Sequence, residues 1–253
     1  MNRIHRAAAH PDDRLTAKPG AWGELALTLP VFLTYQLGVV FLHVRNASDL
    51  LSGRLLELAH GDRLTYLALT AVLATAMVGV FALLGRGHAL RPRKLVQIAL
   101  EGSAYAISMG AASSWLVGKL FARVSPAAAE GPFAGLIMSL GAGFYEEIAF
   151  RVALFGLGAK LLVWLIARQR IALVGSSPVP RPRALFVMAA WALVCAFAFS
   201  LVHYLGPLGD AFDARSFVAR VVLGLALTLV YGARGFAAAV WTHALYDIWV
   251  LVL

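Results

Sequence analysis

Residues 184–204 read ALFVMAAWALVCAFAFSLVHY, a run without aspartate, glutamate, lysine or arginine. A helix rises about 1.5 Å per residue, so roughly 20 apolar residues cross the hydrocarbon core of a bilayer. The run is therefore predicted to be a transmembrane helix. The only cysteine of the sequence, Cys195, lies inside it, which excludes a disulfide framework within the chain.

Similar apolar runs recur along the 253 residues, at about 24–44, 64–84, 95–121, 133–167, 216–233 and 236–253. The run 133–167 is too long for one straight span. Its glycines Gly135, Gly141 and Gly143 favour a short apolar hairpin or half-helix at 133–143, followed by a full helix from about 144. The fold class is thus predicted to be all-α, a polytopic integral membrane bundle of 7–8 transmembrane helices.

The composition agrees with this prediction, since 60% of the residues are hydrophobic and only 14% are charged. Typical soluble domains are about 45–50% apolar and about 25% charged. These values exclude disordered, fibrous, nucleic-acid-binding and small secreted proteins. The net charge of +9 then reports cytoplasmic loops rather than an acidic partner. We expect the lipid bilayer as a partner and no nucleic acid.

The basic residues also predict the orientation. With seven crossings and the N-terminus inside, 13 of the 22 lysines and arginines fall in inside segments and 5 in outside loops. This bias favours an inside N-terminus and an outside C-terminus in a multi-pass protein of the bacterial cytoplasmic membrane. An eighth span would reverse the downstream half. Residues 172–183 are predicted to form an inside loop, and 46–63 a short amphipathic piece outside.

Ionisable side chains inside the predicted helices are concentrated in the last 110 residues: Glu146, Glu147, Arg151, His203, His243 and Asp247. Each costs roughly 2.5–3.5 kcal/mol at the centre of a span, so they must pair or line a wet cavity. In the N-terminal half, Glu101 lies near enough to the inner end of its helix to reach the interface.

Helical spacing predicts which of these groups meet. Glu147 and Arg151 are four residues apart, so they share a helix face and can pair. Glu146 is turned by about 100° from Glu147 and is free to point into a cavity. His243 and Asp247 are also four apart, so Asp247 can hold one ring nitrogen and fix the tautomer.

A carboxylate beside an imidazole in a desolvated pocket is a general base for water, and a second imidazole can donate a hydrogen bond to an oxyanion. Together these groups supply the parts for peptide-bond hydrolysis. Cys195 has no activating partner in the sequence, and no serine stands in a recognisable nucleophile setting.

Three motifs stand in order on separate predicted helices: Glu146-Glu147-x-x-x-Arg151, Phe199-x-x-x-His203 and His243-x-x-x-Asp247. They resemble the signature of the CAAX prenyl protease 2-like (CPBP or Abi) family of intramembrane proteases. The resemblance covers about residues 132–250. It implies an endopeptidase whose partners are membrane-anchored peptides or proteins, with CAAX-type, leader or C-terminal sorting-anchor segments as the cleaved parts.

The resemblance also implies roles for the reacting groups. Glu146, assisted by His203, would activate the attacking water, while His243 and the residue at 247 would stabilise the oxyanion. Family members often have asparagine at the last position, and an ionised Asp247 cannot donate a hydrogen bond. Asp247 therefore acts either in its protonated form or as the residue that orients His243.

The remaining motif residues are implied to handle the substrate. Glu147 with Arg151 would organise the site or grip the C-terminal end of the substrate, and Phe199 would also contact it. The chain then divides into a cytoplasmic tail at 1–20, N-terminal transmembrane helices at 21–131 and a catalytic membrane core at 132–253.

Two alternatives stay open. The first is a metalloprotease in which Glu146, His203 and His243 bind zinc through two histidines and one carboxylate; we expect a site without a cofactor, because the sequence has no His-Glu-x-x-His helix. The second is a non-catalytic membrane protein, an immunity factor or a proton-coupled carrier, that uses the same buried polar cluster.

Overall fold

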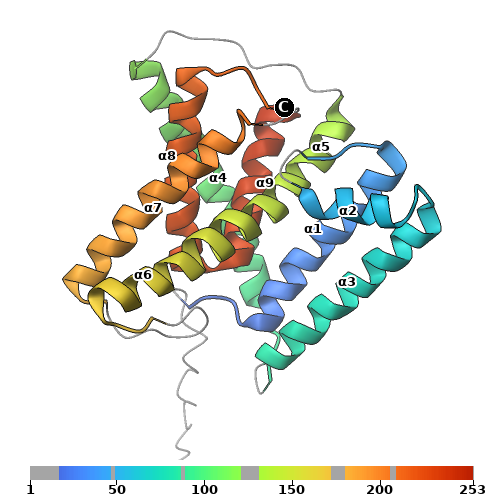
Figure 1. Cartoon of the computed structure of the whole chain (residues 1–253), viewed down its shortest axis with the longest axis horizontal. Coiled ribbons are helices and arrows are strands. Elements are labelled where there is room, and N and C mark those ends of the chain that lie inside the picture. Colours follow the sequence, from blue (N-terminus) through green and yellow to red (C-terminus); the bar gives the residue numbers. More distant parts are fainter. Residues whose placement is uncertain are drawn as a thin grey trace, which may run out of the picture.

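The chain folds into a bundle of helices, as its computed structural model shows (Figure 1). The structure describes residues 17–46, 49–86, 89–120, 131–171, 180–205 and 209–252, and these ranges contain no β-strand. The predicted all-α class is confirmed. In chain order the helices are α1 (Ala21–Leu42), α2 (Leu50–Leu58), α3 (Arg63–Leu84), α4 (Pro92–Leu120), α5 (Pro132–Gly141), the π-helix η2 (Ala142–Leu157), α6 (Gly158–Ala167), α7 (Pro182–Val202), α8 (Ala214–Arg234) and α9 (Phe236–Leu251).

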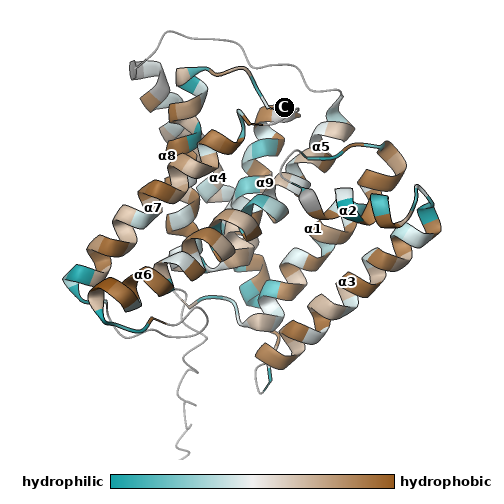
Figure 2. Cartoon of the chain, in the orientation of Figure 1, coloured by the Kyte–Doolittle hydropathy of each residue, from teal (hydrophilic) through white to brown (hydrophobic). Residues whose placement is uncertain are grey.

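Five of the described helices are long and apolar enough to cross a membrane: α1, α3, the joined helix Pro132–Ala167, α7 and α8. Figure 2 shows apolar residues along most of their length. On α3, Leu64 is 78% exposed and Val72 is 64% exposed, as expected of side chains that face lipid rather than water. The predicted polytopic membrane bundle is confirmed, and the predicted runs 95–121 and 236–253 form α4 and α9.

Residues 132–167 form one uninterrupted helix, so of the two alternatives at 133–143 the hairpin is wrong. The short helix is present as α5, and it continues into η2 without a break. Gly141, where α5 meets η2, has right-handed helical angles of φ −64° and ψ −48°. The hairpin prediction treated the glycines as helix breakers. Within a membrane, however, a break would leave backbone groups without partners, which favours a continuous helix. The long helix runs obliquely across the bundle, which accommodates its length (Figure 1).

One of these glycines serves close packing instead of a turn. A Cβ atom added at Gly143 would lie 2.8 Å from the carbonyl oxygen of Val240 and 2.9 Å from the backbone nitrogen of Ala244. Small residues let membrane helices approach closely, and Gly143 brings η2 directly against the backbone of α9. The two helices that carry most of the charged motif residues are thus in contact.

Three helices begin at an aspartate whose carboxylate accepts a hydrogen bond from the backbone N–H three residues later. This N-cap satisfies an amide that has no partner within the helix. The pairs are Asp49 with Ser52 at 2.8 Å, Asp62 with Thr65 at 2.7 Å and Asp213 with Ser216 at 2.9 Å. The first cap starts α2, which lies within the short amphipathic piece predicted at 46–63. The predicted loop at 172–183 falls mostly outside the described residues.

The N-terminus of α9 is capped by a residue of α1. The backbone N–H of Ala237 donates to Oε2 of Glu24 at 2.5 Å. The turn before α9 passes through Gly235, whose φ of 96° suits glycine. A Cβ at Gly235 would also meet the Glu24 carboxylate, which would have to shift from its place at the start of α9.

The turn between α8 and α9 is fixed by an ion pair to α4. Nε and Nη2 of Arg234 lie 2.6 Å and 3.0 Å from the two carboxylate oxygens of Glu101, and Nη1 donates to the carbonyl oxygen of Ala17 at 3.1 Å. Glu101 was expected to lie near enough to the end of its helix to reach the interface. It forms a two-point pair with Arg234, a partner that the sequence did not reveal, because the fold brings residue 234 beside α4.

Candidate active site

The helix η2 contributes three charged side chains to the interior of the bundle. Glu146, Glu147 and Arg151 are 4%, 0% and 1% exposed. Burying such groups is costly unless each is paired, so their partners define what the site can do. π-helical turns are uncommon and occur frequently at functional sites.

Glu147 links two helices through one carboxylate oxygen. Its Oε1 lies 3.0 Å from Nη1 of Arg151, so the pair predicted from the four-residue spacing is present. The same Oε1 lies 2.8 Å from Nδ1 of His243 on α9. Because a carboxylate only accepts, Nδ1 of His243 carries the hydrogen.

Arg151 is enclosed by residues of α7 and α8. Its guanidinium carbon lies 4.3 Å from the centre of the Phe199 ring, a cation–π distance. Nη2 is 3.4 Å from the carbonyl oxygen of Gly224 on α8. The resemblance implied that Arg151 either organises the site or binds the C-terminal end of the substrate. Its side chain is only 1% exposed, and this burial favours the first role. Phe199 covers it and also lies 5.9 Å from the His243 ring.

His203 caps the C-terminus of α7 and is partly accessible, with 24% of its side chain exposed. Its Nδ1 lies 2.8 Å from the carbonyl oxygen of Phe199, one turn earlier, and must donate to it. In the neutral ring, Nε2 therefore carries the lone pair. That atom is 3.7 Å from Oε2 of Glu146.

His243 is positioned by a different residue than the spacing predicted. Asp247 was expected to fix its tautomer, but Oδ2 of Asp247 lies 3.5 Å from Nε2, whereas Glu147 holds Nδ1 at 2.8 Å. The contact that orients the ring thus comes from another helix, which no local spacing can reveal. Asp247 faces the nitrogen on the opposite side of the ring, and its side chain is 20% exposed.

Three atoms from three helices converge around one point. Oε2 of Glu146 is 3.7 Å from Nε2 of His203 and 3.8 Å from Nε2 of His243. Both gaps are longer than a direct hydrogen bond, and a polar contact beyond about 3.5 Å suits a bridging water. The arrangement can therefore bind and polarise a small polar molecule. Among the residues that the structure describes, no group of three or more His, Cys, Asp or Glu side chains is arranged around a metal position. The zinc alternative for Glu146, His203 and His243 stays a prediction.

Arg220 on α8 is a charged neighbour of the site that the sequence reasoning did not use. Its Nη2 lies 2.6 Å from Oδ2 of Asp210, and its guanidinium stands over the Tyr204 ring at 5.2 Å. The backbone N–H of Asp210 donates to the carbonyl oxygen of His203 at 2.8 Å. The positive charge is close enough to interact with both His203 and Asp247. An arginine seven residues into an apolar helix was the available signal.

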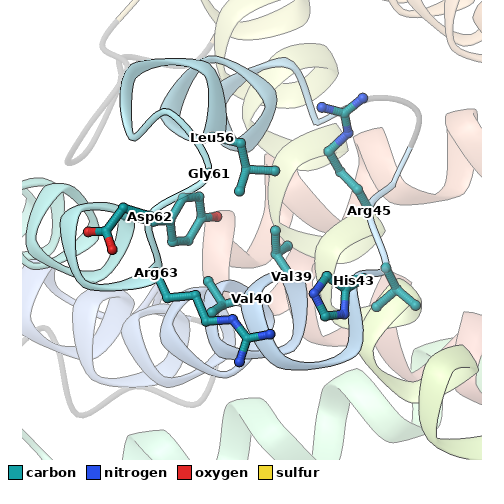
Figure 3. Close-up of a pocket in the computed structure, with 10 residues that line it drawn as sticks. Val39, Val40, His43, Arg45, Leu56, Gly61, Asp62 and Arg63 are labelled. Carbon is teal, nitrogen blue, oxygen red and sulfur yellow. The ribbon is translucent and has the colours of Figure 1, made fainter.

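A cavity of about 500 Å³ lies away from this cluster, among α1, α2 and α3. Figure 3 shows Val39, Val40 and Leu56 with His43 and Arg63 around it. None of the six charged and imidazole residues of the predicted site lines it. The cavity is therefore distinct from the place where Glu146 meets the two histidines.

The fold and the site together define a class of protein, a helical membrane protein with two carboxylates, an arginine and two histidines clustered inside its bundle. Residues 128–249 match the family model described as type II CAAX prenyl endopeptidase Rce1-like. This C-terminal segment belongs to the CAAX prenyl protease 2-like family, and the resemblance seen in the motifs is confirmed. Searches of curated proteins and of solved structures gave no match.

Proposed function

We propose that the protein is an intramembrane endopeptidase of the bacterial cytoplasmic membrane that cleaves membrane-anchored peptides or proteins. The observation that carries the proposal is the approach of Glu146 to the Nε2 atoms of His203 and His243 at 3.7 Å and 3.8 Å inside an apolar bundle. The family match supports protease activity in general. CAAX-type C-termini, leader peptides and C-terminal sorting anchors are the candidate substrates.

In the proposed reaction, a water molecule bound between Glu146 and His203 attacks the scissile carbonyl carbon. Its proton passes to Oε2 of Glu146 or to Nε2 of His203, which both face the gap. The water oxygen forms the new bond to carbon, and the C–N bond breaks as the proton is delivered to the leaving amine. General base catalysis of this kind contributes about 10²- to 10⁴-fold.

The developing oxyanion is proposed to accept a hydrogen bond from Nε2 of His243. Glu147 holds the other nitrogen at 2.8 Å, so the ring presents Nε2 in a fixed direction. Nearby carboxylates, among them Asp247 at 3.5 Å, offset the charge of an imidazolium. Donors fixed in advance cost no reorganisation when the oxyanion forms.

Arg220 is the proposed partner for a carboxylate of the substrate. It lies at the accessible end of the site, with 24% of its side chain exposed, and its present partner Asp210 is 57% exposed. A substrate carboxylate can take the place of Asp210, because arginine binds carboxylates in a two-point geometry. A free C-terminus a few residues beyond the cleaved bond, as in CAAX-type peptides, supplies such a group.

The test is cleavage of a quenched-fluorescent peptide that ends in a farnesylated cysteine and three further residues, by purified protein in detergent. Glu146→Gln and His203→Ala are each expected to lower kcat by at least 100-fold, because each removes a group that handles the proton of water. Glu57→Gln, at an exposed ion pair on α2, is the control and should leave kcat unchanged. Full activity of both site variants would contradict the mechanism. A wild-type protein that cleaves no membrane-anchored peptide would favour the carrier or immunity alternative.

The same assay separates the proposed metal-free site from the zinc alternative. A chelator such as phenanthroline, applied to the active protein with a non-chelating isomer as the control, is expected to leave the rate unchanged. Loss of activity that added zinc restores would assign the metal to Glu146, His203 and His243 and overturn the metal-free proposal.

A further inference from the structure

A group of buried polar side chains joins the first three helices to η2. This polar node consists of Gln36 on α1, Ser52 on α2, Tyr66 on α3 and Tyr145 on η2. The first three are 0% exposed and Tyr145 is 7% exposed. In an apolar bundle such groups are costly unless their hydrogen bonds are made, so the bonding pattern is strongly constrained.

The hydrogen bonds fix the orientation of the Gln36 amide. Its Oε1 accepts from the hydroxyl groups of Tyr66 and Ser52, the latter at 3.2 Å. The carbonyl end is therefore turned toward α2 and α3. The amide nitrogen, which only donates, faces the hydroxyl of Tyr145 and binds it.

A second layer holds the node in place. The backbone N–H of Ser52 donates to Asp49 at 2.8 Å, and the Tyr35 hydroxyl donates to the same carboxylate at 2.8 Å. The Tyr35 ring then packs edge-on against Tyr145, with 5.5 Å between the ring centres. Two residues of α1 therefore hold Tyr145 in place: Gln36 binds its hydroxyl and Tyr35 packs against its ring.

Tyr145 immediately precedes Glu146, so these contacts with α1 lie next to the proposed base. Adjacent residues on a helix point in different directions, one here toward α1 and the other toward the two histidines. Rotation of η2 about its axis would break the bond between Gln36 and Tyr145 and would also move Oε2 of Glu146 out of the gap it shares with His203 and His243.

We infer that Gln36 and Tyr145 are positioning residues for the reaction: through their hydrogen bond the helices α1 to α3, which lie outside the matched segment 128–249, set the rotation of η2 and place Glu146 between the histidines. The inference rests on the proposed endopeptidase function. It assigns the N-terminal helices a part in the chemistry beyond anchoring the chain in the membrane.

Tyr145→Phe tests the inference in the farnesyl-peptide assay. The variant keeps the ring and loses the hydroxyl, so kcat should fall at least tenfold with KM within twofold of wild type. Gln36→Met breaks the same bond from the α1 side and should give a similar loss. The double variant should lose no more kcat than Gln36→Met alone, because that substitution has already broken the bond to Tyr145.

Tyr66→Phe is the matched control. It also removes one buried hydroxyl that binds Gln36, but Ser52 still donates to the amide oxygen and the hydrogen bond of Gln36 to Tyr145 keeps both its partners. We expect a lower melting temperature with kcat within twofold of wild type. Equal losses of kcat in Tyr66→Phe and Tyr145→Phe would reduce the node to a general stabilising role and overturn the inference.

The two proposals fail in different ways. A Tyr145→Phe variant with wild-type kcat, in a protein that Glu146→Gln inactivates, removes the positioning role and leaves the protease. Full activity of Glu146→Gln removes the proposed base and the positioning role with it. Should Tyr145→Phe fail to accumulate in membranes, Gln36→Met alone decides, since it leaves η2 unaltered.

Discussion

Replacing Gly143 with alanine should move the charged residues of η2 away from His243 on α9. A Cβ at this position would lie 2.8 Å from the carbonyl oxygen of Val240 and 2.9 Å from the backbone nitrogen of Ala244, where ordinary contact begins at 3.4 Å. Both atoms are backbone and cannot swing aside. The α9 backbone must therefore move away from η2 by about 0.6 Å.

The displacement acts directly on a hydrogen bond of the site. Glu147 follows Gly143 by four residues, and its Oε1 is 2.8 Å from Nδ1 of His243 on α9. An increase of about 0.6 Å takes this distance to roughly 3.4 Å, beyond the usual limit near 3.2 Å. Gly143→Ala is expected to cost about 1–3 kcal/mol of stability, as overpacking does elsewhere. It should also lower kcat by at least about tenfold, since a misplacement of about 1 Å can cost about 100-fold.

Thermal unfolding in detergent and cleavage of the farnesylated peptide measure the two effects. Gly232→Ala in α8 is the matched control, because a Cβ there meets no atom within 4 Å. Gly232 lies in the last turn of α8, where alanine should stabilise by at most about 0.5–1 kcal/mol and leave kcat unchanged. A Gly143→Ala protein as stable and as active as the control would refute the argument that close approach of η2 and α9 builds the site.

Three further predictions concern single side chains. Arg151→Met removes one of the two buried partners of Glu147 and should lower the free energy of unfolding by about 3–5 kcal/mol; an unchanged melting temperature would contradict the pairing. Asp247→Asn supplies an amide donor and should keep at least half of the wild-type kcat, whereas Asp247→Ala should lose at least tenfold, and equal rates for both would argue against a polar role. Gly235→Ala combines an unfavourable φ with a clash against Glu24 and should destabilise by about 1–3 kcal/mol, measured by the same unfolding assay.

The sequence predicted those parts of the protein that depend on local spacing and on hydropathy. The helices lie within a few residues of the apolar runs, because a bilayer leaves a long apolar segment few alternatives to a helix. The ion pair of Glu147 with Arg151 also followed from spacing alone, since side chains four residues apart meet on any helix.

Contacts between distant segments were beyond such reasoning. The hydrogen bond of Glu147 to His243 joins residues 96 apart, and the bond of Gln36 to Tyr145 joins residues 109 apart. Both depend on how the helices pack, which spacing does not encode. Gly141 and Gly143 misled the prediction for a related reason, because they allow close approach to Tyr35 of α1 and to the backbone of α9 rather than a turn.

The cap that Glu24 provides for α9 has a consequence for biogenesis. The chain is made from its N-terminus, so α1 enters the membrane long before α9 is synthesised. The Ala237 amide at the start of α9 obtains its partner only when the last helix reaches the first. Residues 128–249 contain the whole cluster of charged and imidazole groups, yet the side chain that caps their final helix comes from the first helix of the chain. Completion of the site is thereby coupled to insertion of both ends of the bundle.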